Sequence, residues 1–239
     1  MMLELNDREL GKIVVMPNRR AKKIIARRKV DHIRLTVPHD FNPRRIPSLL
    51  EELRPRLMRI KPPLPILFKE EDVIGSLTFD AMLVRDPFQK DIRLALKEKQ
   101  LRVFLPEKLD INREHVQQTI REAIINVLRI EAKRVLPAKT AQFARQHGLT
   151  YQSVKIGSSR GRWGSCSKKK DINYSLFLML LPERLIDYVV LHELAHTVEM
   201  NHGDKFWQLL ERMCGENVQE LRTKTRKFQS PDYRFPACK

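Results

Sequence analysis

The sequence predicts an α+β fold in which helices pack against a small antiparallel sheet, preceded by a basic, mainly-β half. Two observations predict it. Up to about residue 109, short apolar runs alternate with turn residues, whereas from residue 110 onward apolar residues recur at helical spacing. We therefore expect a mainly-β basic region over 1–109 and a second region over 110–239. No internal repeat is apparent in the residue pattern.

The elements of the first region follow from alternation and turn residues. Residues 13–16 and 32–37 are predicted strands, and the second of them ends at Pro38. A helix over 43–60 is expected to begin after Asn42, and Pro55 predicts a kink or an early end within it. The clearest later strands are at 77–79 and 101–105.

The elements of the second region are mostly helical. The pattern predicts a helix over 111–135, and Pro137 then starts another that ends before Gly148. Three short strands follow at 153–156, 162–166 and 171–175. A helix runs from Pro182 toward Met200, and a final helix begins at Asp204 and ends at Gly215. We expect the basic tail after Glu220 to be partly extended.

Charge and composition narrow the class of partner. Lys and Arg number 46 against 29 acidic residues, a net charge of +17, which favours anionic partners such as nucleotides or nucleic acid. The sequence has no run of about 18 apolar residues, so we expect no membrane span. The start of the chain lacks the basic-then-apolar order of a signal peptide. The three cysteines (Cys166, Cys214, Cys238) form neither a disulfide framework nor a metal knuckle, so we expect a cytoplasmic protein.

The motif His192-Glu193-Leu194-Ala195-His196 is the main candidate site. Histidines four residues apart lie on one helix face, so both imidazoles can bind one cation at about 2.0–2.1 Å. Glu193 lies beside the first of them, within reach of a metal-activated water. This spacing predicts a zinc-dependent hydrolase with Glu193 as general base, although nickel or cobalt can occupy such nitrogen sites.

A catalytic zinc ion also needs a third protein ligand. His202 is our preferred candidate, because Asn201 can adopt the left-handed conformation that would turn the chain back over the metal. Glu199 is the alternative, but it lies seven positions from His192, about 10 Å along the helix.

Two longer stretches, RGRWGSCS (160–167) and INYSLFLMLLPERLIDYVVLHELAHTVEMNHGDKFW (172–207), resemble the YgjP-like metallopeptidase-domain family, which is related to the SprT-like and WLM zinc metalloproteases. The resemblance implies a zincin-like catalytic domain that hydrolyses peptide bonds. It implies His192, His196 and His202 as metal ligands and Glu193 as the base.

The resemblance also suggests how a peptide binds. In proteases of this type an edge strand pairs with an extended substrate, and residues 153–176 could supply that strand. Arg160, Arg162 and Trp163 are the candidate substrate-binding residues, although core packing explains Trp163 better. We expect Phe206 and Trp207 to support the turn at His202.

Two alternative functions follow from the charge. One is a metal-dependent phosphohydrolase resembling a nucleoside triphosphate pyrophosphatase, because an activated water can also attack phosphorus. Against it, the sequence shows no phosphate-binding glycine loop among its eight glycines. The other is a nucleic-acid-associated protease of the SprT type, which steeply salt-dependent DNA binding would support.

Overall fold

The computed structural model describes residues 3–28, 32–60 and 67–228. By its contacts the chain divides into two compact units, residues 1–65 and 66–239, and each has a hydrophobic core of its own. The change from strands to helices near residue 110 therefore lies inside the second unit. Its core continues from Phe68 to Leu221, which joins the strands before residue 109 to the helices after it.

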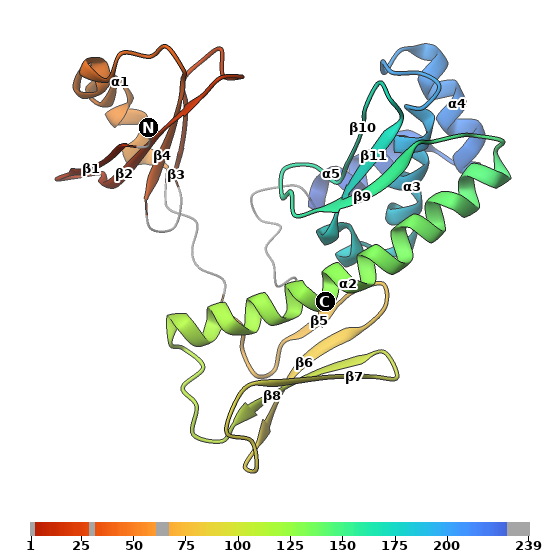
Figure 1. The fold of residues 1–239 in the computed structure, drawn as a ribbon, viewed down its shortest axis with the longest axis horizontal. Coiled ribbons are helices and arrows are strands. Elements are labelled where there is room, and N and C mark those ends of the chain that lie inside the picture. Colours follow the sequence, from red (N-terminus) through yellow and green to blue (C-terminus); the bar gives the residue numbers. More distant parts are fainter. Residues whose placement is uncertain (1–2, 29–31, 61–66, 229–239) are drawn as a thin grey trace. The chain divides into compact units, whose positions relative to one another are not determined.

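The first unit is a four-stranded sheet with one helix (Figure 1). Its strands lie in the order β1-β2-β4-β3, with β1 at Leu3–Asp7, β2 at Gly11–Asn18, β3 at Ile25–Arg28 and β4 at Ile33–Pro38. The 3-10 turn η1 (Pro43–Arg45) leads into α1 (Ile46–Arg59). The Asn42 side chain accepts a hydrogen bond from the Arg44 N–H, so Asn42 begins this helical segment as expected. Pro55 is accommodated inside α1, which runs on to Arg59.

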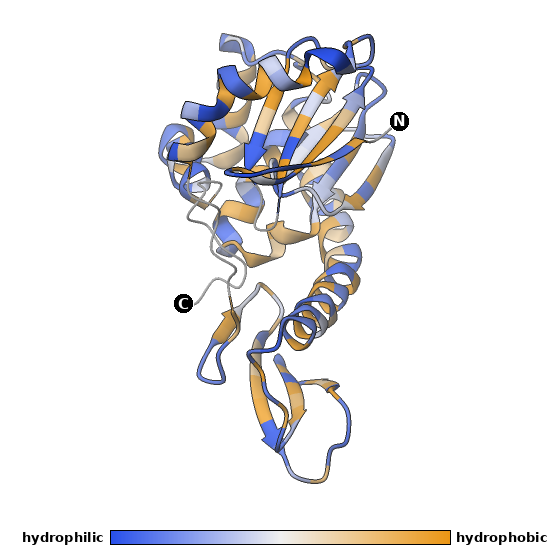
Figure 2. Ribbon diagram, turned by 90° about the vertical axis from the view of Figure 1, so that its left-hand side faces the viewer, coloured by the Kyte–Doolittle hydropathy of each residue, from blue (hydrophilic) through white to orange (hydrophobic). Residues whose placement is uncertain are grey.

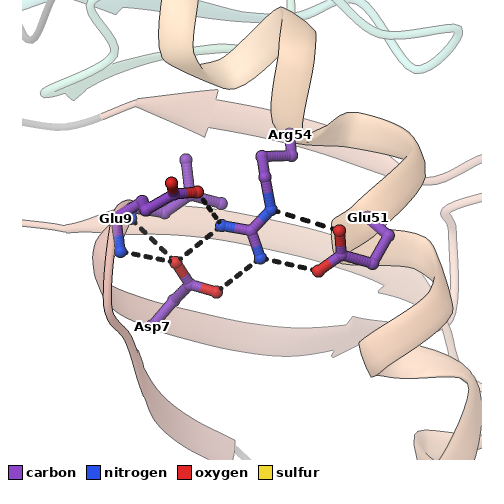
Figure 3. Close-up of polar contacts among 5 residues, drawn as sticks. Asp7, Glu9, Glu51 and Arg54 are labelled. Carbon is purple, nitrogen blue, oxygen red and sulfur yellow. Dashed lines mark hydrogen bonds and ion pairs between the residues drawn. The ribbon is translucent and has the colours of Figure 1, made fainter.

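Arg54 on α1 is the centre of an ion-pair network that ties the helix to the turn between β1 and β2 (Figure 3). Its guanidinium binds Asp7 through two bonds of 3.0 and 2.9 Å, Glu9 at 2.7 Å and Glu51 at 2.7 Å. The hydrogen bonds from Arg54, Leu10 and Glu9 hold the pKa of Asp7 well below its usual range.

The second unit starts with another four-stranded sheet, ordered β5-β6-β8-β7. Its strands are β5 (Val73–Gly75), β6 (Asp80–Asp86), β7 (Arg93–Lys97) and β8 (Gln100–Pro106). The strand expected at 77–79 is wrong, because these residues form a bend between β5 and β6. Ser76 closes that bend: its N–H and its hydroxyl both donate to the carbonyl of Phe79.

The two four-stranded sheets have one arrangement, related by a shift of 68 residues in the two central strands (from Ile13 to Ala81 and from Ile33 to Leu101) and of 69 residues in the first edge strand (from Leu5 to Ile74). In both, the two central strands are parallel and each edge strand is antiparallel to its neighbour. The shift also carries the start of α1 onto the start of the next helix. The two turn bonds made by Asn18 and Asn42 recur at Asp86 and Asp110.

The residue pattern shows no internal repeat, yet the structure contains a repeated strand arrangement. Few residues are shared between the copies, Arg34 with Arg102 and Pro38 with Pro106 being two of them. What the copies share is strand register and turn chemistry. Many combinations of apolar residues satisfy both, so the repeat is hidden at the level of residue identity.

Helix α2 (Glu114–Gln146) is one continuous helix of 33 residues. The sequence predicted two helices divided at Pro137, and this is wrong because Pro137 lies inside the helix. Leu128, Ala132, Leu136 and Ala144 are all buried along one side of it, so the packing continues across the proline. Burial of this stripe outweighs the lost backbone hydrogen bond.

The remainder of the second unit packs against α2. It consists of a three-stranded sheet ordered β10-β11-β9, the 3-10 segment η2 and three helices (Figure 1). The bounds are β9 Ser153–Gly157, β10 Gly164–Cys166, β11 Asp171–Ser175, η2 Leu176–Leu180, α3 Glu183–Ala195, α4 Asp204–Cys214 and α5 Val218–Phe228. The sheet is mixed rather than antiparallel, since β9 pairs in parallel with β11.

Two expectations for the last residues need correction. Helix α4 ends at Gly215, as expected, with Gly215 in the left-handed conformation. It is not the final helix, because α5 follows and buries Val218, Leu221 and Thr225. The partly extended tail was expected after Glu220, but the described part of it is helical to Phe228, and residues 229–239 lie outside the described residues.

Within the described part of the chain, no helix combines the length and apolar character that crossing a lipid bilayer requires. Figure 2 shows polar residues interrupting the apolar ones along the helices.

Candidate metal centre and its cavity

Helix α3 presents the first two histidines of the motif. His192 lies in its last turn and His196 is its C-cap residue. The helix ends five residues before the Met200 that the pattern predicted. The end of α3 is closed by bonds between residues three apart: the Thr197 N–H and hydroxyl both donate to the carbonyl of Leu194, at 2.9 and 2.7 Å. These bonds satisfy a carbonyl that the next helical turn would otherwise have used.

The turn after α3 brings His202 back to the first two histidines. The Nε2 atoms of His192 and His202 lie 3.2 Å apart, and one nitrogen from each of the three rings lies within 4.8 Å of the others. A left-handed Asn201 was expected at this turn, and this is wrong: Asn201 is not among the residues with positive φ. Instead the Asn201 carbonyl accepts from the N–H of Gly203, which precedes α4.

The donor set fits a divalent transition metal. A tetrahedral zinc ion with nitrogens at about 2.0–2.1 Å spaces them roughly 3.4 Å apart, close to the separation of the His192 and His202 nitrogens. His196 Nδ1 lies 3.0 Å from the carbonyl of Glu199, and a carbonyl only accepts. That contact places the proton on Nδ1 and leaves Nε2 free to bind a metal. Glu199, the alternative ligand, thus contributes its backbone and lies outside the histidine group.

Aromatic side chains from α4 surround this histidine group. The Trp207 indole N–H donates to the carbonyl of His202 at 3.0 Å. The Phe206 ring stacks on His196, with centroids 4.5 Å apart, and meets His192 edge-on at 5.0 Å. Both residues therefore support the His202 turn, as expected. Burial lowers the pKa of His192 to about 3 and lowers that of His196, so both rings are neutral before any cation binds.

Glu193 is buried beside the histidines, with 5% of its surface exposed. Its Oε2 atom has no hydrogen-bond partner among the described residues. Burial raises the pKa of the Glu193 carboxyl to about 8, against the opposing effect of Arg162. An unpartnered buried carboxyl is costly for folding, which is typical of a functional group rather than of a structural one.

Gly164 on strand β10 makes room for that carboxylate. A Cβ atom at position 164 would lie 2.6 Å from Oε1 of Glu193, a distance that real Cβ contacts do not reach. Sequence reasoning missed this residue. The clue was present, since glycine inside a strand marks a close approach by another group.

A cavity of about 350 Å³ opens beside the histidine group. Arg162 and Trp163 line it, whereas Arg160, the third predicted substrate residue, does not. The Arg160 guanidinium lies over the Phe177 ring instead, 5.0 Å from its centroid. Cys166 lies outside both the cavity lining and the histidine group, and burial raises its pKa to about 11.

Arg222 and Arg226 also line the cavity. Both come from α5, in a region that the sequence suggested to be partly extended, so they were not candidates. The Arg222 guanidinium lies 4.8 Å from the centroid of the Trp207 ring, in a cation–π contact.

Comparison with known proteins gives one extensive match. The family described as "YgjP-like, metallopeptidase domain" matches residues 22–228. Comparison with the curated proteins gives no match.

Two solved structures show a partial likeness. The metallopeptidase zymogen of Pyrococcus abyssi abylysin is 21% identical, covers 39% of this chain and 93% of its own, and has a TM-score of 0.36. For the zymogen of Methanocaldococcus jannaschii jannalysin the identity is 22%, the coverage 38% and 94%, and the TM-score 0.35. These likenesses are too slight to bear on activity. The family match alone spans most of the chain and includes the histidine group: the chain belongs to the YgjP-like metallopeptidase family.

Proposed function

We propose that this protein is a zinc metallopeptidase in which His192, His196 and His202 bind the metal and Glu193 is the general base. One observation carries the proposal: three imidazole nitrogens lie within 4.8 Å of one another, beside a buried carboxyl, at the edge of a cavity. The family match supplies the reaction class, hydrolysis of a peptide bond.

The donor set supports zinc as the metal. Three neutral imidazoles and an open fourth position are typical of catalytic zinc, although nickel and cobalt bind the same nitrogens. A bound zinc ion supplies two things, polarisation of the substrate carbonyl and a lowered pKa for water.

The protein side chains then manage the proton. Glu193 takes a proton from a water molecule while that water attacks the substrate carbonyl. Glu193 then passes the proton to the departing amine. Its burial favours this exchange, because a desolvated carboxylate is a stronger base. Trp207 keeps the third ligand in place through its bond to the His202 carbonyl.

Strand β10 is the proposed docking edge for substrate. It is the outer strand of its sheet, paired with β11 on one side only among the described residues. It also carries Gly164, the residue that touches Glu193. An extended peptide that adds to this edge would run past the catalytic carboxylate.

The test uses Glu193→Gln, with Glu199→Gln as matched control. Glu199 belongs to the same segment but contributes only its backbone to the site. Cleavage of an unstructured protein and bound metal are measured for both. We expect Glu193→Gln to hold the metal and lose about 10²–10⁴-fold in turnover, while the control keeps both. Wild-type cleavage by Glu193→Gln contradicts the general-base assignment.

A metal-dependent phosphohydrolase acting on nucleotides is the second candidate. It is favoured by one observation, the three arginines that line the cavity. Nucleoside triphosphates assayed beside the unstructured protein, with the same two variants, decide between the two reactions.

A further inference from the structure

The cavity is lined by three positively charged arginines that neither the histidine group nor the general-base role of Glu193 requires. Arg162 reaches it from the segment between β9 and β10, and Arg222 and Arg226 reach it from α5. Glu193 is the single carboxylate among the described residues that line it. Three guanidinium groups thus face one buried carboxyl.

These arginines are not held by carboxylates. Within the described ranges, Arg162, Arg222 and Arg226 form no ion pair, and the one side-chain bond of Arg222 is a long one to Gln219, at 3.4 Å. Arg54, Arg85, Arg134 and Arg184 each bind a glutamate or aspartate, whereas the cavity arginines resemble exposed arginines such as Arg212 in having no carboxylate partner among the described residues. The cavity therefore presents guanidinium forks with free donors.

The arrangement on α5 costs helix stability. Arg222 and Arg226 are four residues apart, so they lie on the same face, and like charges at this spacing destabilise a helix. Thr225 on that face is buried and bonds within its own helix, to the carbonyl of Leu221. The unfavourable pair of charges is explained if an anion binds in the cavity, which α3, α4 and α5 all line.

The cavity walls restrict what that anion is attached to. Trp163, Tyr188, Val189 and Trp207 form an apolar lining beside the arginines. A volume of about 350 Å³ is at the small end of ligand pockets. Such a site suits a short aliphatic stem that ends in a carboxylate, and the guanidinium fork binds a carboxylate through two parallel bonds.

We propose that this cavity is a specificity subsite that binds a carboxylate of the peptide substrate, through Arg162, Arg222 and Arg226. The carboxylate comes either from an aspartate or glutamate side chain near the scissile bond or from a free C-terminus. This inference rests on the proposed peptidase function and adds a preference for acidic substrates.

Binding is measured on the metal-free full chain, so that a metal cannot attract the carboxylate. Both tryptophans of the chain, Trp163 and Trp207, line the cavity, and their fluorescence reports occupancy. Three peptides are compared: one with a single glutamate and both ends blocked, its glutamine twin, and that twin with a free C-terminal carboxylate. We expect one carboxylate peptide to bind about tenfold more tightly than the blocked twin, the change expected for one charge-assisted bond.

The variants Arg162→Gln and Arg226→Gln should each remove most of that difference. Arg212→Gln, which removes the same charge from an exposed position on α4 outside the cavity, should preserve it. If the blocked glutamate peptide binds most tightly, the site is assigned to a side-chain carboxylate. If the peptide with a free C-terminus binds most tightly, the site is assigned to the terminal carboxylate.

Three results overturn the inference: equal binding of all three peptides, an undiminished preference in the cavity variants, or displacement of the peptide by a nucleoside triphosphate that binds more tightly. Hydrolysis by the metal-loaded enzyme is scored separately. Cleavage without any carboxylate preference removes the subsite alone, whereas preferential binding without cleavage removes the peptidase proposal and leaves the subsite.

Discussion

Gly164 and Glu193 are in contact across the space between strand β10 and helix α3, with no room for even a methyl group between them. The hydrogen atoms of Gly164 form one wall of the position that the carboxylate occupies. This contact couples the strand proposed to bind substrate to the residue proposed to move the proton.

Replacing Gly164 by alanine should therefore displace the Glu193 carboxylate without touching the histidines. We expect turnover to fall by about a hundredfold, the effect of an error of about 1 Å in placing a catalytic group, with metal binding retained. Gly161→Ala is the control, because a Cβ there meets nothing within 4 Å. Equal activity of the two variants would show that the contact does not position Glu193.

Replacing His202 by alanine should remove tight metal binding. The ring supplies one of three nitrogens, so its loss should weaken affinity by more than the about 10–100-fold that changes outside the ligands cause. Metal content after dialysis measures this. His115→Ala is the control, since this exposed histidine on α2 is outside the group. Unchanged metal content in His202→Ala would rule out this ligand.

Replacing Trp207 by phenylalanine tests the support of the His202 turn. The variant keeps an aromatic ring under Arg222 but loses the N–H that binds the His202 carbonyl. We expect metal affinity to fall about 10–100-fold, as for other outer-shell bonds. Trp163→Phe, which alters a cavity-lining indole that makes no bond to His202, should leave metal affinity unchanged. Equal affinities for both would make the indole bond irrelevant to the metal.

The Arg54 network predicts acid sensitivity of the first unit. Its hydrogen bonds lower the folded-state pKa of Asp7 below the unfolded value, so the stabilisation is complete above about pH 4 and is lost as pH falls further. Hydrogen exchange of residues 3–28 and 32–60 measures it. Asp7→Asn should be less stable at pH 7 and lose less on acidification. A wild-type acid response in Asp7→Asn would contradict the assignment.

The sequence predicted best those features that neighbouring residues determine. Asn42 begins a helical segment, Gly215 ends α4, and His192 lies on a helix, because capping and periodicity are local effects. The convergence of His202 was also predictable, since only a few residues separate it from α3.

Features set by distant residues were not predictable in the same way. Pro137 stays helical because buried neighbours compensate for it, and β9 joins β11 in parallel although its own residues carry no sign of direction. Arg222 and Arg226 became site residues only when α5 packed beside α3. Nothing in a basic tail distinguishes such arginines from solvated ones.

The two copies of the sheet differ in the length and the contacts of the helix that follows them. In the second copy the helix extends to Gln146. One continuous helix therefore shares a core with β5–β8 and also packs against η2 and α3. The elements that this helix supports include α3, which carries His192 in its last turn. The first copy ends its helix at Arg59 and has a core of its own, which includes none of the elements that present the histidines.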